Sequence, residues 1–453
     1  MAAPRQTGAP PSKAITASPL SVGFETLDRK MFDPDRTYAH LAELGVKWAR
    51  VQTGWCRCEP EKGRYEFGWL DAVVDRLLQI GIQPWFNLGY GNRLYTPEAK
   101  DVSAVGWAPI FTQEARTGWV RFVEALAKHF AQRVRHWKIW NEPNIPTFWK
   151  PRKPAAKDYV ELVRLTAPVL REHVPRAVLI GGALAGMPVP YLRECLEAGL
   201  AQYVDRISYH PYRPVPEKNY AQEVAQFRKL LEQHRPGIAL WQGECGCPSH
   251  TSELATGAMA KLPWTPERQA KWLLRRILSD LAEEVELISY FHTVDLLHYN
   301  WGEGKSTLHN YKGLLRGADY TAKPSYFAYQ AICTLFDAET QRDRNCRVSV
   351  EGLAGSEKIA GDIHAVGFRR KGFLLTAYWA ATDLFQPWTP RTVNLRITPG
   401  TNLKLAKPVL IHPLGQEVSQ LPSPTHRKTP SAWPTCPWPI TPGSLPIRKP
   451  CPA

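Results

Sequence analysis

Short strand-like runs alternate with longer amphipathic segments through most of this chain, from residue 21 to about residue 300. The short runs are apolar and rich in β-branched and aromatic residues, and segments with helical periodicity separate them. In one such segment Trp69, Val73, Leu77 and Ile80 recur at helical spacing. This alternation predicts βαβ units and a parallel sheet, which eight strand–helix pairs close into a barrel. The expected strands are Ser21–Glu25, Lys47–Gln52, Gln83–Leu88, Val134–Asn141, Val178–Ala183, Arg206–Tyr212, Ala239–Glu244 and Leu287–His292.

Composition divides the chain into four parts. Residues 1–20 are rich in Ala, Pro, Ser and Thr and are expected to form a flexible N-terminal segment, followed by the barrel over residues 21–340. Residues 341–420 consist of strand-like runs and turns, which predicts a small β domain. Residues 421–453 contain ten prolines without a hydrophobic period, so we expect a disordered or extended tail. The predicted fold class is α/β, a (β/α)8 TIM barrel with a C-terminal β-sandwich-like accessory domain.

The net charge of +15 raises the question of a nucleic-acid partner. The basic residues are scattered, without a run of five, so we expect no nucleic-acid binding. A positive surface would favour an acidic substrate such as a uronic acid sugar. The first 20 residues lack the apolar stretch of a signal peptide, and no segment has the apolar length of a membrane span. We therefore expect a cytoplasmic protein without a membrane partner.

Nine cysteines form no recognisable disulfide framework. The pairs Cys56-x-Cys58 and Cys245-x-Cys247 both follow predicted strands, and four thiolates are a ligand set that Zn²⁺ accepts. However, zinc ligand pairs are usually separated by two to four residues, and here one residue separates each pair. We expect no metal and no organic cofactor.

Two glutamates stand at the ends of predicted strands, where a barrel places its catalytic residues. Glu142 closes the fourth strand and Glu244 closes the seventh, and both strands are otherwise largely apolar. A carboxyl group at the edge of a low-dielectric core has a raised pKa, as a general acid needs. A pair of such carboxyl groups is what glycosidic bond hydrolysis requires.

The residues around Glu142 carry a resemblance to a known family. The stretch Trp140–Asn144 reads Trp-Asn-Glu-Pro-Asn and resembles the Asn-Glu-Pro signature of clan A glycoside hydrolases. It is most similar to family 39, which contains β-xylosidases and α-L-iduronidases, and the resemblance spans roughly residues 22–335. It implies that Glu142 is the acid/base, Glu244 the nucleophile, and Asn141 a ligand of the sugar 2-hydroxyl. Retaining enzymes of this kind hold the two carboxyl groups about 5–5.5 Å apart.

The resemblance also implies supporting residues. His210-Pro211-Tyr212 is similar to the family's His-x-Tyr, in which the tyrosine hydroxyl contacts the nucleophile. In relatives an arginine lies beneath the nucleophile, and Arg50 in the second strand matches it. A purely structural ion pair for Arg50, and a merely hydrogen-bonded His210, are equally compatible with the sequence.

Further substrate-binding residues are expected on the loops that follow the strands. Asn87 and Tyr90 end the third strand and are expected to bind sugar hydroxyls. Trp301 follows the eighth strand and is the candidate platform under the reacting ring, with plain rim packing as the alternative.

These residues together predict a retaining glycoside hydrolase that acts by double displacement on β-xylosides or β-glucosides. Its partner is expected to be a glycoside or oligosaccharide substrate, and a homo-oligomer remains open. The alternatives are a transglycosylase, a non-catalytic carbohydrate-binding barrel, and a metal-dependent barrel hydrolase. The last would need a His-x-His on the first strand, where residues 21–25 contain no histidine.

Overall fold

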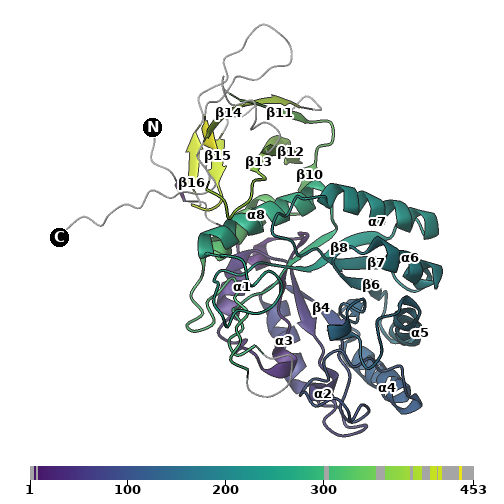
Figure 1. The fold of residues 1–453 in the computed structure, drawn as a ribbon. Helices are drawn as coiled ribbons and strands as arrows, with labels where there is room; N and C mark the ends of the chain where they lie inside the picture. The colour runs from purple at the N-terminus through teal and green to yellow at the C-terminus, as the bar shows by residue number, and fades with distance from the viewer. Residues whose placement is uncertain are drawn as a thin grey trace, which may run out of the picture.

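The computed structural model describes residues 5–6, 9–299, 306–352, 363–387, 391–399, 409–415, 417–420 and 438–440. Its centre is a closed barrel in which successive parallel strands are neighbours and the last strand pairs with the first (Figure 1). The barrel strands are β2 (Leu20–Gly23), β3 (Trp48–Gln52), β4 (Gln83–Leu88), β5 (His136–Ile139), β6 (Val178–Ala185), β7 (Arg206–His210), β8 (Ala239–Cys245) and β9 (Leu287–Tyr290). All eight expected strands are present in the expected order, so the prediction of a TIM barrel is confirmed.

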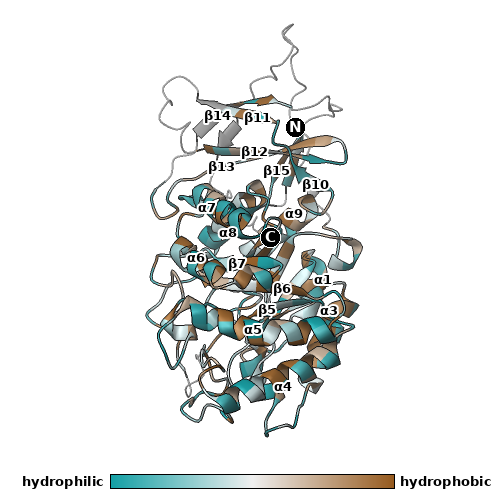
Figure 2. Cartoon of the chain, turned by 90° about the vertical axis from the view of Figure 1, so that its right-hand side faces the viewer, coloured by the Kyte–Doolittle hydropathy of each residue, from teal (hydrophilic) through white to brown (hydrophobic). Residues whose placement is uncertain are grey.

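Helices surround the barrel because each has one apolar face to bury. In α3, Leu70, Val73, Val74 and Leu77 are buried against the sheet. Hydrophobic and hydrophilic residues accordingly alternate along α4 and α5 (Figure 2). The α-helices are α1 (Tyr38–Leu44), α2 (Trp55–Cys58), α3 (Gly68–Gln79), α4 (Gln113–Phe130), α5 (Ala156–His173), α6 (Val189–Glu197), α7 (Tyr220–His234), α8 (Pro266–Ala282) and α9 (Pro324–Leu335). Short 3-10 turns are η1 (Ser12–Ala14), η2 (Leu27–Arg29), η3 (Pro146–Phe148) and η4 (Leu200–Gln202).

Large side chains fill the inside of the barrel. Trp85, Ile180, Trp241 and Leu287 form a buried cluster contributed by four different strands. The indole of Trp85 donates a hydrogen bond to Ser21 Oγ at 3.0 Å. Many other tryptophans are core residues as well, and those that are fully buried include Trp55, Trp119, Trp137, Trp140, Trp149 and Trp272. The high tryptophan content therefore largely reflects packing.

The described residues of the C-terminal region form three antiparallel sheets of three strands each, one of which includes the N-terminal strand β1. Their orders are β10-β12-β13, β11-β14-β17 and β1-β16-β15. The strands are β1 (Arg5–Gln6), β10 (Thr340–Arg342), β11 (Arg347–Gly352), β12 (Ile363–Arg370), β13 (Phe373–Ala380), β14 (Arg391–Thr398), β15 (Val409–His412), β16 (Glu417–Gln420) and β17 (Trp438–Ile440). Buried Glu217 joins β13 to α8, because it accepts hydrogen bonds from Trp379 Nε1 at 2.7 Å and from Arg275 at 2.6 and 2.8 Å.

Parts of both chain ends contact the rest of the structure. Ser12 is fully buried and its hydroxyl donates to Leu41 O at 2.9 Å, so this part of the N-terminal segment packs on the barrel. Strand β1 pairs with β16. In the proline-rich tail β17 pairs with β14, and the rest of residues 421–453 lies outside the described residues. Within the described part of the chain, no helix combines the length and apolarity that crossing a membrane requires.

Candidate active site

The loop after β5 carries Glu142 in a constrained conformation. Trp140 and Glu142 have φ angles of 73° and 45°, in the left-handed region that non-glycine residues seldom adopt. The chain is held there by β6, since Glu142 N donates to Ala183 O at 2.7 Å. The Asn144 side chain adds two hydrogen bonds to the backbone of Ala185, at 2.8 and 2.9 Å. The second asparagine of the Asn-Glu-Pro-Asn motif thus fixes the backbone that presents Glu142.

Glu244 lies near the end of β8. The residue before it, Gly243, lies very close to Ser208 of the neighbouring strand. A Cβ atom on Gly243 would lie 2.0 Å from Ser208 Oγ, so a larger residue there would require the Ser208 side chain to move. Both oxygens of Glu244 have partners. Tyr212 Oη donates to Oε1 at 2.8 Å, and Arg50 Nη1 forms an ion pair and hydrogen bond with Oε2. The expected contact between Tyr212 and the proposed nucleophile is therefore present.

The two glutamates lie close together. One carboxylate oxygen of Glu142, one of Glu244 and a ring nitrogen of His210 all lie within 4.8 Å of one another. Retaining glycosidases have a carboxyl separation of about 5–5.5 Å, while inverting enzymes have about 6.5–9.5 Å. The separation of Glu142 and Glu244 therefore fits the retaining arrangement better than the inverting one.

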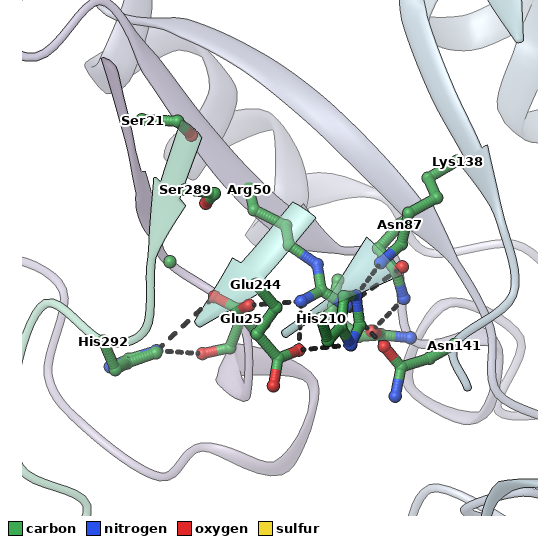
Figure 3. Close-up of polar contacts among 12 residues, drawn as sticks. Ser21, Glu25, Arg50, Asn87, Lys138, Asn141, His210, Glu244, Ser289 and His292 are labelled. Atoms are coloured by element: carbon green, nitrogen blue, oxygen red, sulfur yellow. Dashed lines mark hydrogen bonds and ion pairs between the residues drawn. The ribbon is translucent and has the colours of Figure 1, made fainter. Parts of the chain in front are cut away.

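Arg50 organises the floor of this site (Figure 3). Its side chain is almost fully buried, and its Nη1 also lies 3.0 Å from Glu25 Oε1. Its Nη2 donates to Asn141 Oδ1 at 2.6 Å and to Asn87 Oδ1 at 3.2 Å. Arg50 therefore pairs with Glu25 and Glu244 and also orients Asn141.

Different surroundings push the pKa values of the two glutamates apart. Burial raises the pKa of Glu142 to about 8, and the nearby Glu244 charge adds to this effect. Burial also acts to raise the pKa of Glu244, but Arg50, Lys138 and the Tyr212 hydroxyl outweigh it and bring this pKa below its ordinary value. At neutral pH Glu142 is thus protonated and Glu244 ionised, as an acid and a nucleophile must be.

His210 connects Glu142 to a residue that sequence reasoning missed. Its Nδ1 lies 2.8 Å from Glu142 Oε1, and its Nε2 lies 3.1 Å from Nζ of the fully buried Lys138. Burial, with Lys138 and Arg50 nearby, holds the pKa of His210 well below its usual range, so the ring is neutral. The available signal for Lys138 was a lysine two residues after the first residue of the barrel strand that leads to Glu142.

Glu25 is a second buried carboxyl group that the sequence did not single out. It follows β2 and contacts Arg50, and its pKa is raised to about 7 because burial outweighs the attraction of Arg50. His292, which closes the eighth expected strand, lies 3.0 Å from the backbone oxygen of Glu25. Asp295 pairs with Lys323 at 2.6 Å. His292 and Asp295 are therefore parts of the supporting structure.

The sequence-predicted sugar ligands have different surroundings. Asn87 is fully buried, and its amide nitrogen donates to Gln52 Oε1 at 2.6 Å while its oxygen accepts from Arg50, so it supports the site from below. Tyr90 is nearly buried and stacks on Phe148 with ring centroids 5.6 Å apart. Trp301 lies outside the described residues.

A metal ion is a poor fit to this cluster. Within the described ranges, the group of residues close enough to share an ion is Glu142, His210 and Glu244. Arg50 already neutralises Glu244, and Lys138 is bonded to the second nitrogen of His210, so a metal ion would compete with partners that these residues already have. The four cysteines near the barrel end are not part of this group, and Cys58 Sγ instead contacts Thr53 O at 3.1 Å.

Comparison with known proteins assigns this barrel to a family. The sequence pattern of the family described as "Glycosyl hydrolases family 39" matches residues 43–368, well over half of the chain. The chain belongs to glycosyl hydrolase family 39. The paired Glu142 and Glu244 of this family 39 member occupy the ends of β5 and β8, on the side of the barrel where such enzymes carry their catalytic residues.

Characterised relatives and solved structures agree with this assignment. A β-xylosidase of Geobacillus stearothermophilus is 26% identical over 300 residues, which is 62% of this chain and 58% of that protein. A β-xylosidase of Caldicellulosiruptor saccharolyticus is 24% identical over 314 residues, 64% of this chain and 62% of that protein. This family 39 chain thus spans about three fifths of the length of these curated relatives. A family 39 glycoside hydrolase from Bacteroides cellulosilyticus WH2 has the same fold, with a TM-score of 0.65, 21% identity, and coverage of 92% of this chain and 78% of that one.

Proposed function

We propose that this chain is a retaining β-glycosidase that hydrolyses β-xylosides or β-glucosides by double displacement. The observation that carries the proposal is the close pair of carboxyl groups of Glu142 and Glu244, whose surroundings shift their pKa values in opposite directions. The β-xylosidases among the relatives support xylosides as the first substrates to test. A cytoplasmic location, the absence of nucleic-acid binding and a homo-oligomer stay predictions from the sequence.

In the first step Glu244 attacks the anomeric carbon, and Glu142 gives its proton to the departing glycosidic oxygen. In the second step water attacks the glycosyl-enzyme, and Glu142, now a carboxylate, accepts a proton from that water. The sugar leaves with its original anomeric configuration. Tyr212 and Arg50 keep Glu244 ionised and aimed, and Asn141, fixed by Arg50, is the candidate ligand of the sugar 2-hydroxyl.

The test is removal of the proposed nucleophile. Glu244→Ala should lose nearly all hydrolysis of nitrophenyl β-xyloside, and azide should restore turnover, because the small anion fits where the carboxylate was. The product by proton NMR should be the α-glycosyl azide, with inverted configuration. Glu25→Ala is the matched control, since Glu25 is another buried carboxyl group in contact with Arg50, and azide should not rescue it. Normal activity in Glu244→Ala would overturn the assignment.

A further inference from the structure

Lys138 is a buried cation directly behind the proposed acid/base. It lies in β5, is fully buried, and its ammonium sits 5.8 Å from the ring centre of Trp85 inside the barrel. Its hydrogen-bond partner among the described residues is His210 Nε2, at 3.1 Å. In its ammonium form, which the charges of Glu244, Glu25 and Glu142 favour against burial, Lys138 carries three donors and no lone pair and can only donate to that nitrogen.

This single contact determines where the His210 proton is. Because Nε2 accepts from Lys138, the neutral ring must carry its hydrogen on Nδ1. Nδ1 lies 2.8 Å from Glu142 Oε1, so His210 donates to that oxygen. The other oxygen, Oε2, has no hydrogen-bond partner among the described residues and is the one that can carry the transferable proton.

We propose that Lys138 is a positioning residue for the acid/base: its ammonium fixes the His210 tautomer, so that His210 always donates to Glu142 Oε1 and the catalytic proton stays on Oε2. This inference rests on the proposed function and adds a residue to it. Without Lys138, His210 is free to carry its hydrogen on Nε2. Nδ1 then becomes an acceptor, and protonated Glu142 turns its proton toward the histidine and away from the leaving group.

The Lys138 ammonium lies among charged groups, where it can stabilise the carboxylate that Glu142 becomes during turnover. It is faced by Arg50 from β3, Glu25 after β2, Glu142 after β5 and Glu244 from β8, besides His210 from β7. Burial and Arg50 lower the pKa of Lys138, and the three glutamates oppose this effect. When Glu142 passes its proton to the glycosidic oxygen it becomes a buried carboxylate. The hydrogen bond from His210, backed by the Lys138 ammonium, then stabilises this new charge.

The test compares leaving groups. A dinitrophenyl group departs without protonation, whereas the methoxide of methyl β-xyloside needs the acid. Lys138→Met should lose about 100-fold in kcat/KM on the methyl glycoside, within the range of general acid catalysis, and about threefold or less on the dinitrophenyl glycoside. Lys138→Arg, which keeps a donor, should recover most of the loss. Lys47→Met is the matched control, because Lys47 is a buried lysine that bonds backbone oxygens of Ser12 and Gly81 at the other end of the barrel. It should affect both substrates equally.

The ring itself provides a second, independent measurement. The nitrogen chemical shifts of His210, assigned with a His210→Asn variant, should show hydrogen on Nδ1 in the wild type and on Nε2 in Lys138→Met. An unchanged tautomer in Lys138→Met, or equal losses on the two glycosides, would overturn the proposal. If the wild-type protein hydrolyses no glycoside, the proposed function fails, and the tautomer measurement still decides the arrangement of Lys138 and His210.

Discussion

Replacing Tyr212 by phenylalanine tests the electrostatics of the site with the least change in shape. The substitution removes only the hydroxyl that donates to Glu244 Oε1 at 2.8 Å. Arg50 still pairs with the other oxygen, so Glu244 remains ionised at neutral pH. The expected result is a change in the acidic limb of the pH profile.

The size of this change follows from the hydrogen bond. A hydrogen bond to a charged acceptor contributes about 1.5–3 kcal/mol, and one pKa unit corresponds to about 1.4 kcal/mol. Complete loss of the bond would therefore raise the pKa of Glu244 by about one to two units. The Glu244 side chain is 15% exposed, so water can replace part of the bond. We expect a rise of about one unit in Tyr212→Phe.

The assay is kcat/KM for nitrophenyl β-xyloside as a function of pH. Glu244 must be ionised, so activity is lost as the pH falls through its pKa, and raising that pKa moves the acidic limb upward. Glu142 must be protonated, so activity is lost as the pH rises through about 8. Tyr212→Phe should shift the acidic limb and leave the basic limb in place. A shift of the basic limb alone would mean that the two glutamates have the opposite roles.

Other predictions concern the acid and the stability of the barrel. Glu142→Gln should remove the basic limb near pH 8 and slow methyl β-xyloside by about 10²–10⁴-fold, while dinitrophenyl β-xyloside is affected far less in its first step. Arg50→Met leaves Glu25 and Glu244 buried without their cation, so the free energy of unfolding in urea should fall by about 3–5 kcal/mol. Glu217→Ala should lower it by a similar amount by breaking the buried pair with Arg275, yet leave kcat unchanged in the folded fraction. A loss of kcat in fully folded Glu217→Ala would contradict the purely structural role of Glu217.

The sequence predicted the elements of this fold well because local patterns encode them. Short apolar runs mark the barrel strands, and no observed strand end differs from the expected one by more than two residues. Trp85 and Trp241 show what the local pattern leaves out, because they come from different strands and pack together in the barrel interior. Burial depends on how distant strands meet, and a list of residues does not contain that information.

Strand ends revealed Glu142 and Glu244, but the residues beneath them could be placed only by the structure. Lys138 and Glu25 have no local signature beyond a charge in or beside an apolar strand. Their function depends on which side chains face them from other strands, as His210 faces Lys138. Asn87 has a clear local signature, its position at a strand end, which predicts a sugar ligand. Only the structure shows that its amide nitrogen is bonded to Gln52 and its amide oxygen to Arg50.

The two glutamates differ in role because their partners differ. Chemically they are the same group, and two carboxyl groups this close resist simultaneous ionisation. Arg50 and Tyr212 contact Glu244 and direct the negative charge to it. Glu142 instead has a neutral histidine, with the compensating cation one residue further away at Lys138. In the proposed mechanism, the direct contact with Arg50 keeps Glu244 ionised as the nucleophile. Glu142 contacts Lys138 only through His210, so it can hold a proton as the acid and still carry a negative charge once that proton has left.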